Sequence, residues 1–455
     1  MAANSSTLII PVESQVRELD AKLLLACVAA ERGFPVVMGS RAYVHHRMAR
    51  LPRGVYLAKS MRKMSDRMFD VISKLGHEIV AWDEEGLVRF PDPFYFQRRL
   101  SAKALANVRH LLAWGEDGAR ALRAFEGYPG CPIHVTGNPR IDLLRPEMRG
   151  FFECETQEIR AEYGRFVLVN TNFSGLNHFH DTLSELKHNL EPARSGPLDP
   201  FMEGRAAFRN QVLDHFKRLV PALSEALPDT RIIVRPHPSE SHDLWRDIAR
   251  GLANVDVINR GNVYPWLMAS RVLVHNGCTT AVEAAILGTP AVAFQPVTDP
   301  TYDMTLPNSL SHQALDLKDV QKTVRSIVAG ELGTRDEPAV RAILDRHVAA
   351  LEGPLAADRM IDVLEDAGYR NRMPEATTPL RRVEAEIHLA GRTAVKFLNR
   401  YRPRHRNNLE FHRHRFPGVT VAELHQKIAL FERELGRFKG IGAVQIAEHI
   451  FAIGK

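Results

Sequence analysis

The chain has 455 residues, which is too long for one ordinary hydrophobic core and predicts two domains with a tail. Its 45% hydrophobic and 25% charged residues are typical of a soluble globular protein, and no apolar run approaches the ~20 residues that span a bilayer. The four cysteines are scattered without a CxxC pair, so the sequence gives little support to a zinc site or a disulfide framework.

The first 150 residues alternate β-rich runs with helical periods. A helix is expected from residue 15, because apolar residues recur at helical spacing from Leu19 to Ala30 and Gly33 closes the run. A further helix is expected over residues 64–77, and strands are expected over 7–12, 35–40, 54–59 and 78–82, with two more strand ends in HLLAWG and IHVTGNPRID. Strands separated by helices of this length predict βαβ units and a parallel sheet.

A second α/β series begins at RFVLVNTNFSG, residues 165–175, and is followed by a polar insertion that runs to about residue 204. We then expect a helix over about 206–227 and strand–helix alternation up to PAVAFQP, residues 290–296. The predicted fold class is therefore α/β with two Rossmann-like domains. The predicted ranges are 1–150 for the first domain, 151–373 for the second, and 374–455 for a basic helical C-terminal extension.

The basic character of the protein belongs to this extension. Residues 381–415 hold ten lysines and arginines against three acids, a net charge of +7, whereas the whole chain carries only +6. Val383, Ile387, Ala390, Ala394, Phe397 and Tyr401 alternate at steps of four and three, which predicts an amphipathic helix. Such a helix can pack on its own protein or lie on an anionic membrane.

Unusual polar clusters follow three strands of the second series: NTNFSG, RPHP and HNGCTT. In open parallel sheets, ligands bind at the carboxyl ends of strands, where helix N-termini offer unpaired N–H groups to anions. In HNGCTTAVEAA, Gly277 permits close backbone approach, Thr279 and Thr280 add hydroxyls, and Glu283 is able to accept from a sugar hydroxyl. This set suits a phosphate attached to a ribose, and the plainer alternative is that Thr279 is an N-cap.

His237 stands between two prolines, which hold it on a stiff loop at a strand end. A histidine fixed beside Arg235 is better explained as a phosphate ligand or leaving-group acid than as a structural residue. In the first series, Asp83, Glu84 and Glu85 directly follow the strand EIVAW. One carboxylate facing a cleft would act as a general base on an acceptor hydroxyl, and the alternative is a solvated acidic turn.

Other signals are missing from the sequence. There is no GxGxxG after a strand, no GxxxxGK[ST] and no GxSxG. HFHD, residues 178–181, contains metal-capable side chains, but two histidines two positions apart do not share a helix face, so no metal site is predicted. The basic tail has few interleaved aromatic residues and no nucleic-acid module, so nucleic-acid binding is unsupported.

Taken together, these motifs resemble those of the GT-B glycosyltransferases, the superfamily that includes the UDP-sugar 2-epimerases. The segments VTGNPRID and HNGCTTAVEAAILGTPAVAF carry this resemblance. More narrowly, RPHP with DEEG resembles the HP and (D/E)(D/E)G motif pair of bacterial sialyltransferases and Kdo transferases, which use CMP-activated acidic sugars. The opening PVESQVRELDAKLLLA, with DEEGLV, NTNF and FHRHRFPGVT, is similar to bacterial surface carbohydrate biosynthesis proteins over nearly the whole chain.

The resemblance implies two Rossmann-like domains facing a cleft, and it implies roles for individual residues. Glu84 or Glu85 would be the general base, and Asp83 is the weaker candidate. His237 would stabilise the departing CMP phosphate. The donor site would be formed by Arg235 and Pro238, by Asn172 and Ser174, and by Gly277, Thr279, Thr280 and Glu283. Thr279 and Thr280 stand where that pattern usually has two serines, so hydroxyl groups are kept at both positions.

The expected activity is transfer of an acidic ulosonic sugar, of the nonulosonate or Kdo type, from a CMP donor to a surface glycan such as capsule or lipopolysaccharide. The acceptor would be lipid-linked, and the resemblance implies no cofactor and no metal. The alternatives are a UDP-sugar transferase or 2-epimerase on the same scaffold, and a non-catalytic glycan-assembly protein. Because MAANSSTLIIPVES lacks a basic segment followed by an apolar one, we expect a cytoplasmic protein, peripheral on the inner membrane through its basic tail.

Overall fold

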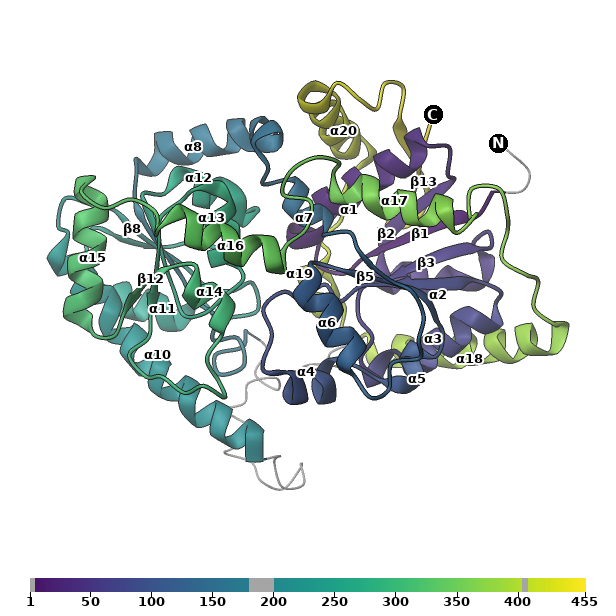
Figure 1. Cartoon of the computed structure of the whole chain (residues 1–455), viewed down its shortest axis with the longest axis horizontal. Coiled ribbons are helices and arrows are strands. Elements are labelled where there is room, and N and C mark those ends of the chain that lie inside the picture. Colours follow the sequence, from purple (N-terminus) through teal and green to yellow (C-terminus); the bar gives the residue numbers. More distant parts are fainter. Residues whose placement is uncertain (1–4, 180–199, 403–407) are drawn as a thin grey trace. The chain divides into compact units, whose positions relative to one another are not determined.

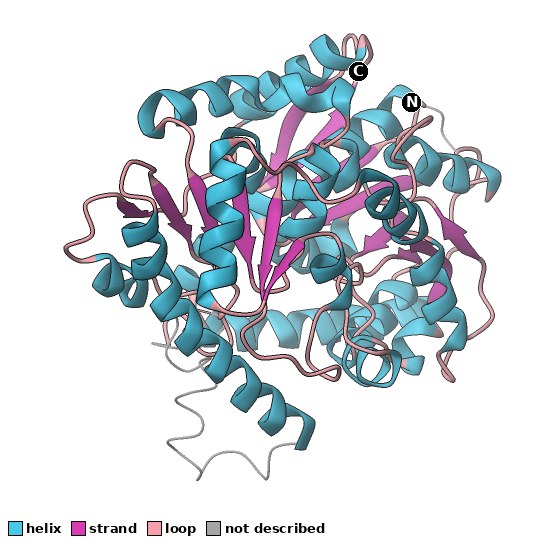
Figure 2. Cartoon of the chain, turned by 60° about the vertical axis from the view of Figure 1, so that its left-hand side comes forward, coloured by secondary structure: helices cyan, strands magenta, loops and turns pink. Residues whose placement is uncertain are grey.

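The computed structural model describes residues 5–179, 200–402 and 408–455, and Figure 1 shows the chain in sequence colours. It divides into two compact units, the first formed by 1–151 with 345–455 and the second by 152–344. Each unit is built around one sheet of mostly parallel strands, with helices packed against it (Figure 2). The predicted α/β class with two Rossmann-like domains is confirmed.

The sheet of the first unit has the strand order β13-β14-β2-β1-β3-β4-β5-β6, and β1 to β6 run parallel. All six residues of β1 are buried, as expected for a central strand covered on both faces. The strands are β1 Thr7–Val12, β2 Val36–Ser40, β3 Gly54–Ala58, β4 Glu78–Ala81, β5 Val108–Ala113, β6 Ile133–Val135, β13 Gly442–Ala447 and β14 Ile450–Gly454.

The helices of the first unit follow the predicted alternation with the strands. In its N-terminal part they are α1 Gln15–Glu31, α2 Arg41–Arg47, η1 Met48–Arg50, η2 Lys63–Ser65, α3 Asp66–Lys74, α4 Asp92–Arg99, α5 Ala102–Leu105, α6 Glu116–Ala124 and α7 Pro139–Asp142. In its C-terminal part they are α17 Ala356–Asp366, α18 Pro379–Asn399, α19 Leu409–Arg415 and α20 Val421–Leu435. Two further helices, η3 Pro146–Phe152 and α16 Glu337–His347, run across the boundaries between the units.

The second unit has a parallel sheet with the strand order β12-β11-β10-β7-β8-β9. Its strands are β7 Val167–Asn170, β8 Ile232–Arg235, β9 Val255–Val257, β10 Val272–His275, β11 Ala291–Phe294 and β12 His312–Ala314. Its helices are α8 Glu153–Tyr163, α10 Pro200–Ala226, α11 Asp243–Ala249, α12 Val263–Ala269, α13 Thr280–Leu287, α14 Thr305–Ser309 and α15 Leu317–Ala329. Most of the predicted polar insertion after residue 177 lies outside the described residues.

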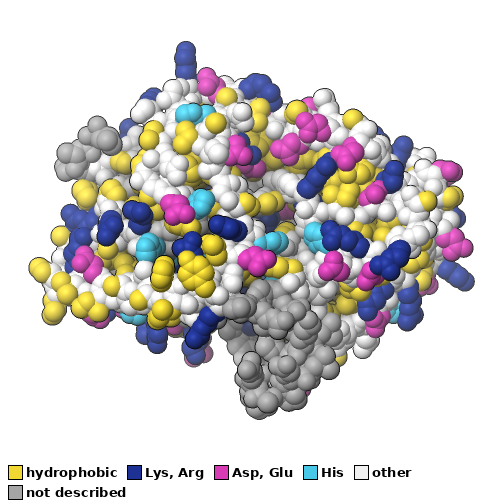
Figure 3. Space-filling view, turned by 180° about the vertical axis from the view of Figure 1, so that it is seen from behind, with side chains coloured by type: hydrophobic (Ala, Val, Ile, Leu, Met, Phe, Trp, Pro, Cys, Tyr) yellow, Lys and Arg dark blue, Asp and Glu magenta, His cyan; other side chains and the backbone are white. Residues whose placement is uncertain are grey.

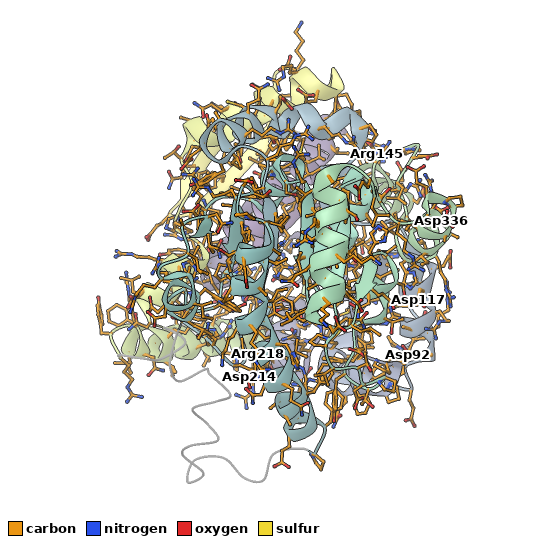
Figure 4. All side chains as sticks on the ribbon, turned by 90° about the vertical axis from the view of Figure 1, so that its left-hand side faces the viewer. Asp92, Asp117, Arg145, Asp214, Arg218 and Asp336 are labelled. Carbon is orange, nitrogen blue, oxygen red and sulfur yellow. The ribbon has the colours of Figure 1, made fainter. Side chains whose placement is uncertain are left out.

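The C-terminal third of the chain differs from the predicted ranges. Residues 345–373 pack in the first unit, although the sequence had placed them in the second domain. Asp142 accepts hydrogen bonds from the backbone N–H groups of Ala356 and Ala357 at 2.7 and 2.9 Å, which satisfies the first turn of α17. Arg145, labelled in Figure 4, donates to the backbone carbonyl of Gly353 at 2.7 Å. These buried contacts hold the returning chain in the first unit.

The predicted helical extension contains helices α18, α19 and α20, but it ends in two strands. β13 and β14 form an antiparallel hairpin, and β14 pairs antiparallel with β2, so the tail closes one edge of the first sheet. A Cβ at Gly39 would lie 2.3 Å from the carbonyl oxygen of His449, which means that this close approach of β14 needs a glycine in β2. Each strand is only five or six residues long, and neither was predicted from the sequence.

Helix α18 confirms the predicted amphipathic helix, and it packs on the protein through a different face from the predicted apolar stripe. Ala385 and Leu389 are its buried residues and join the core of the first unit. The predicted stripe lies on the other side of the helix, where Ile387 and Phe397 are 68% and 58% exposed. Within the described ranges, no helix is both long enough and apolar enough to cross a membrane.

Candidate functional site

In the second unit, the three polar turns follow three adjacent strands. β7 lies between β10 and β8, and His275, Asn170 and Arg235 stand in register at the ends of these strands. Because the strands are parallel, HNGCTT, NTNFSG and RPHP leave the sheet at the same edge. The fold therefore gathers the polar turns singled out in the sequence at the edge where parallel sheets bind ligands.

His237 is half-buried, and its ring is oriented by the loop that follows it. The backbone N–H of Ser239 donates to Nδ1 of His237 at 3.1 Å. Because Nδ1 accepts this bond, a neutral His237 ring carries its proton on Nε2. Pro238 lies between the two residues and is also half-buried. This arrangement makes Nε2 a hydrogen-bond donor held in a fixed direction.

Arg235 is buried and contacts the protein's own backbone. Its guanidinium donates to the carbonyl oxygens of Arg260 and Gly261 at 3.0 and 2.7 Å, and it lies over the ring of Trp266. Burial lowers the pKa of Arg235 to about 10, so the side chain stays protonated at neutral pH. These contacts tie the end of β8 to the turn after β9, and the predicted contact with a donor nucleotide stays a prediction.

Glu240 is a buried carboxylate that the sequence analysis did not single out. It accepts from the backbone N–H of Phe173 at 2.7 Å, from the hydroxyl of Thr171 at 3.0 Å and from the indole N–H of Trp245 at 3.0 Å. It also accepts from the backbone N–H of His237 at 3.2 Å. Burial raises the pKa of Glu240, and these donors oppose that shift. One side chain thus joins the turn after β7 to the turn after β8.

The turn after β10 is fixed by His275, which is fully buried. Its Nδ1 accepts from the backbone N–H of Gly277 at 3.0 Å, and its Nε2 lies 2.8 Å from the hydroxyl of Ser311. Burial lowers the pKa of His275 to about 3, which keeps the ring neutral. Gly277 has a φ of +80°, and a Cβ there would lie 3.1 Å from Cβ of Met304. The turn therefore requires glycine at this position.

The remaining residues of HNGCTT surround the start of α13. Thr279 occupies the N-cap position without a side-chain capping bond, so the N-cap alternative is not supported by its side chain. The hydroxyl of Thr280 lies 2.6 Å from the Cys278 sulfur, and burial raises the pKa of that thiol to about 11. Glu283 is buried one turn further along α13.

A cavity of about 160 Å³ opens at the carboxyl ends of β7, β10 and β11. It brings together three of the predicted donor-binding residues: Asn172, Ser174 and Gly277. Among the described residues, three buried side-chain oxygens in its lining accept no hydrogen bond: Oδ1 of Asn276, Oε1 of Gln295 and Oδ1 of Asn308. Buried acceptors without partners are costly, so they fit a ligand that donates hydrogen bonds. His237, Thr279, Thr280 and Glu283 lie outside this lining.

In the first unit, the acidic cluster follows β4. Asp83 is buried and accepts from Nε of Arg99 at 3.0 Å and from the Tyr95 hydroxyl at 3.2 Å. Glu85 is about half exposed and forms ion pairs with Arg62 at 2.8 Å and with Arg99 at 2.6 Å. Both acids are therefore bound by cations, and the solvated-turn alternative applies only to Glu85.

Glu84 is buried, unlike its neighbour. Its carboxylate accepts from the indole N–H of Trp82 at 2.8 Å, and Nη1 of Arg140 lies 3.8 Å away. Its backbone N–H donates to the carbonyl of Lys59 at 3.0 Å, which joins the turn after β4 to the end of β3. The indole N–H of Trp114 donates to the Asp83 carbonyl at 2.8 Å. These contacts fix the direction of the Glu84 carboxylate.

A buried ion network lies beside Glu84, at the ends of β1 and β3. Lys59 contacts Glu18 and lies 3.1 Å from Glu13, and Lys22 lies 2.7 Å from Glu18. Burial alone would raise the pKa of Glu13, but Lys59 and two arginines lower it to about 2. The carboxyl edge of this sheet therefore carries fixed charges of both signs.

No group of three or more histidine, cysteine, aspartate or glutamate side chains in the described ranges is arranged to hold a metal ion. His178 of HFHD is described, and its backbone forms an isolated antiparallel bridge with Glu240. His180 and Asp181 lie outside the described residues.

Solved structures with the same fold have very different sequences. MnaA of S. aureus with UDP is 12% identical, with a TM-score of 0.51 over 82% of this chain and 100% of that one. A putative UDP-N-acetylglucosamine 2-epimerase from Listeria monocytogenes is 13% identical, with a TM-score of 0.50 over 83% and 100%. A variant of the wall teichoic acid polymerase TagF with CDPG is 12% identical, with a TM-score of 0.50 over 80% and 88%.

No family model matches the sequence, and no curated protein is similar enough in sequence to be matched. At this level of identity the structural likeness concerns the fold. The chain has the two-sheet α/β architecture of the GT-B proteins.

Proposed function

We propose that this protein is a GT-B glycosyltransferase that moves an acidic ulosonic sugar from a CMP donor to a surface glycan acceptor. One observation carries the proposal: the turns with His237, Asn172 and Gly277 follow three adjacent parallel strands. Such an edge offers backbone N–H groups and a histidine donor to one phosphate. The fold shared with nucleotide-bound proteins is compatible with this function.

The second unit would hold the donor. His237 would donate a hydrogen bond from Nε2 to the departing phosphate, while Thr279 and Thr280 would offer hydroxyls beside the start of α13. The cavity supports a place for the base, because a cytosine offers its amino group to acceptors such as Oδ1 of Asn276 and Oδ1 of Asn308. Arg235 would act indirectly, by holding the turn after β9.

The first unit would supply the general base. Glu84 fits this role better than Glu85, because its carboxylate is buried and fixed by Trp82, whereas the half-exposed Glu85 is paired with Arg62 and Arg99. We expect Glu84→Gln to lower kcat by about 100- to 10,000-fold, as is usual for the loss of a general base. Glu85→Gln should leave most activity, and the reverse order of effects would assign the base to Glu85.

The proposal includes a lipid-linked glycan acceptor and a cytoplasmic protein that works at the inner face of the membrane. It includes no cofactor, because the CMP-sugar donor is itself a substrate, and it includes no metal. Transfer should therefore continue in EDTA. Activity that is lost in EDTA and restored by Mg²⁺ would refute this part of the proposal.

The first test is thermal unfolding of the full chain with CMP, CDP, UMP and UDP. A ligand at a hundred times its Kd stabilises by about 2.7 kcal/mol, which is readily measured. We expect stabilisation by CMP in the wild type and a loss of that effect in His237→Ala. His312→Ala is the matched control, because His312 lies on β12, an edge strand of the same sheet that is separated from β8 by three strands.

A UDP-sugar transferase or 2-epimerase is the second candidate, and two of the structural neighbours are described with UDP or as a UDP-sugar epimerase. Selective stabilisation by UDP would favour this candidate. If no nucleotide stabilises the wild type, the protein is better regarded as a non-catalytic glycan-assembly protein. In that case Glu84→Gln, Glu85→Gln and His237→Ala would leave surface glycan production unchanged.

A further inference from the structure

Helix α18 of the first unit presents an apolar face to solvent. Ile387, Phe397 and Leu398 are 68%, 58% and 73% exposed. Successive residues of a helix turn by about 100°, which places the exposed apolar residues on the side opposite the buried Ala385 and Leu389. This exposed face consists of Leu380, Val383, Ile387, Ala390, Ala394, Phe397, Leu398 and, just beyond the helix, Tyr401.

Basic side chains accompany this face. Figure 3 shows hydrophobic side chains gathered at the lower left, where α18 lies, with lysines and arginines beside them. The two acids of the helix are already paired: Glu384 lies 2.5 Å from Lys74, and Glu386 lies 2.9 Å from Arg382. Arg381, in contrast, is exposed near the start of the helix. The surface around the apolar face therefore has an excess of positive charge.

A groove of about 500 Å³ runs between α18 and the segment formed by α2 and η1. Its lining includes the side chains of Arg47, Arg50, Arg382 and His46, with Glu386 as its one acid. Arginine is well suited to bind phosphate oxygens through two parallel hydrogen bonds. A groove of this composition beside an apolar helix face matches the layering of a bilayer surface, where phosphates lie above acyl chains.

We propose that α18 docks the protein on an anionic lipid bilayer. Its apolar face enters the boundary between headgroups and acyl chains, and the groove beside it receives lipid phosphates. A helix with one apolar and one basic face binds in the membrane interface because its apolar side chains are buried among the lipids and its basic side chains attract anionic headgroups. The occupant is a bilayer because the face combines an apolar stripe with positive charge. The inference deepens the membrane location that is part of the proposed function, and it uses residues outside the candidate nucleotide site.

Co-sedimentation of the full chain with vesicles tests this docking surface. We expect binding to vesicles of phosphatidylcholine with phosphatidylglycerol, weaker binding to phosphatidylcholine alone, and a decrease with salt. Ile387→Glu combined with Leu398→Glu should weaken binding at least about tenfold, because charges replace buried apolar area. Val444→Glu with Ile446→Glu is the matched control, because these residues are similarly exposed on β13.

The groove has its own test. Arg47→Gln and Arg50→Gln should each weaken binding to anionic vesicles by about fivefold, which corresponds to ~1 kcal/mol per basic residue near the surface. Arg246→Gln is the control, because Arg246 is an exposed arginine of the second unit. A groove that binds only free inorganic phosphate would leave vesicle binding unchanged in the arginine variants. This outcome distinguishes a site for a free anion from a site for lipid phosphates.

The proposal would be overturned if the wild type bound neither kind of vesicle, or if the α18 double variant and its β13 control bound equally well. It would also be overturned if the wild type did not bind vesicles but formed a dimer in analytical ultracentrifugation that only the α18 double variant disrupted. The double variants of α18 and β13 should retain the wild-type unfolding temperature, because Ile387, Leu398, Val444 and Ile446 are exposed. Deleting the whole tail is unsuitable, since β14 pairs with β2. Nucleotide titration is a separate measurement, so a failure here leaves the proposed transfer reaction untouched.

Discussion

Replacing Glu240 by glutamine tests whether one buried carboxylate holds two turns of the candidate site. Oε1 accepts from the backbone N–H groups of Phe173 and His237, and Oε2 accepts from the indole N–H of Trp245. A glutamine has one acceptor oxygen, so its amide group must face donors at one of these two positions. The less costly orientation keeps the two backbone bonds and leaves the Trp245 donor without a partner.

A buried donor without a partner costs about 1–3 kcal/mol. For a unit of this size, each kcal/mol lowers the unfolding temperature by ~2–4 °C, so we expect Glu240→Gln to unfold about 2–12 °C below the wild type. Glu162→Gln is the matched control in the same unit. Its carboxylate is 47% exposed and pairs with Arg260 at the surface, where such pairs contribute little.

The same variant should weaken nucleotide binding without touching the nucleotide. Loosening the backbone at His237 broadens the positions of Nε2, so stabilisation by CMP should fall, and some should remain because the His237 side chain is intact. Calorimetric unfolding and CMP titration of the two variants check both expectations. The reasoning is refuted if Glu240→Gln unfolds at the same temperature as Glu162→Gln.

Three further predictions concern other buried residues. His275 has its pKa lowered by burial from 6.5 to about 3. Below pH 6.5 this histidine is therefore protonated in the unfolded chain but stays neutral in the folded chain. The free energy of unfolding then falls by about 1.4 kcal/mol for each pH unit below 6.5. Urea unfolding of His275→Asn should lack this part of the pH dependence. Gly277→Ala should lower the free energy of unfolding by about 1–2 kcal/mol because of its positive φ, and by more because the new Cβ contacts Met304. Gly288→Ala is the comparison, because its φ is +74° but its Cβ would meet nothing within 4 Å, so thermal unfolding should show a smaller loss. In Asp142→Asn, the amide NH₂ group would face one of the two backbone N–H donors of α17, so we expect urea unfolding to show a loss of about 1–3 kcal/mol in the first unit. Unchanged stability would contradict the role of Asp142 in holding the returning chain.

The parallel sheets were predictable because their strands follow a simple pattern. Strands such as TLIIPV and VLVH are buried on both faces, so they appear in the sequence as short apolar runs between helical periods. The gathering of the polar turns also followed from the sequence, since parallel strands end at one edge. The strand order that makes β10, β7 and β8 neighbours depends on contacts between distant segments, and no local pattern reports it.

The C-terminal part was not predictable for the same reason. The return of the chain rests on contacts of Asp142 and Arg145 with residues more than 200 positions away. The last strand gains its partner in β2, at the other end of the sequence. Periodicity correctly predicted helix α18, but the amphipathic pattern alone left open whether its apolar stripe faces the core. Packing through Ala385 and Leu389 decides that it does not.

Two histidines at strand ends show how burial separates similar sequence signals. In both, Nδ1 accepts a hydrogen bond from the backbone N–H two residues further along the chain. The donor is Ser239 for His237, at 3.1 Å, and Gly277 for His275, at 3.0 Å. Both rings therefore carry their neutral-state proton on Nε2. Around His275 the core supplies Ser311 as a partner and excludes ligand, so this ring holds the turn in place. His237 has the same local geometry at an equivalent strand end but is only half-buried, and partial exposure is what the proposed contact of its Nε2 with a phosphate requires.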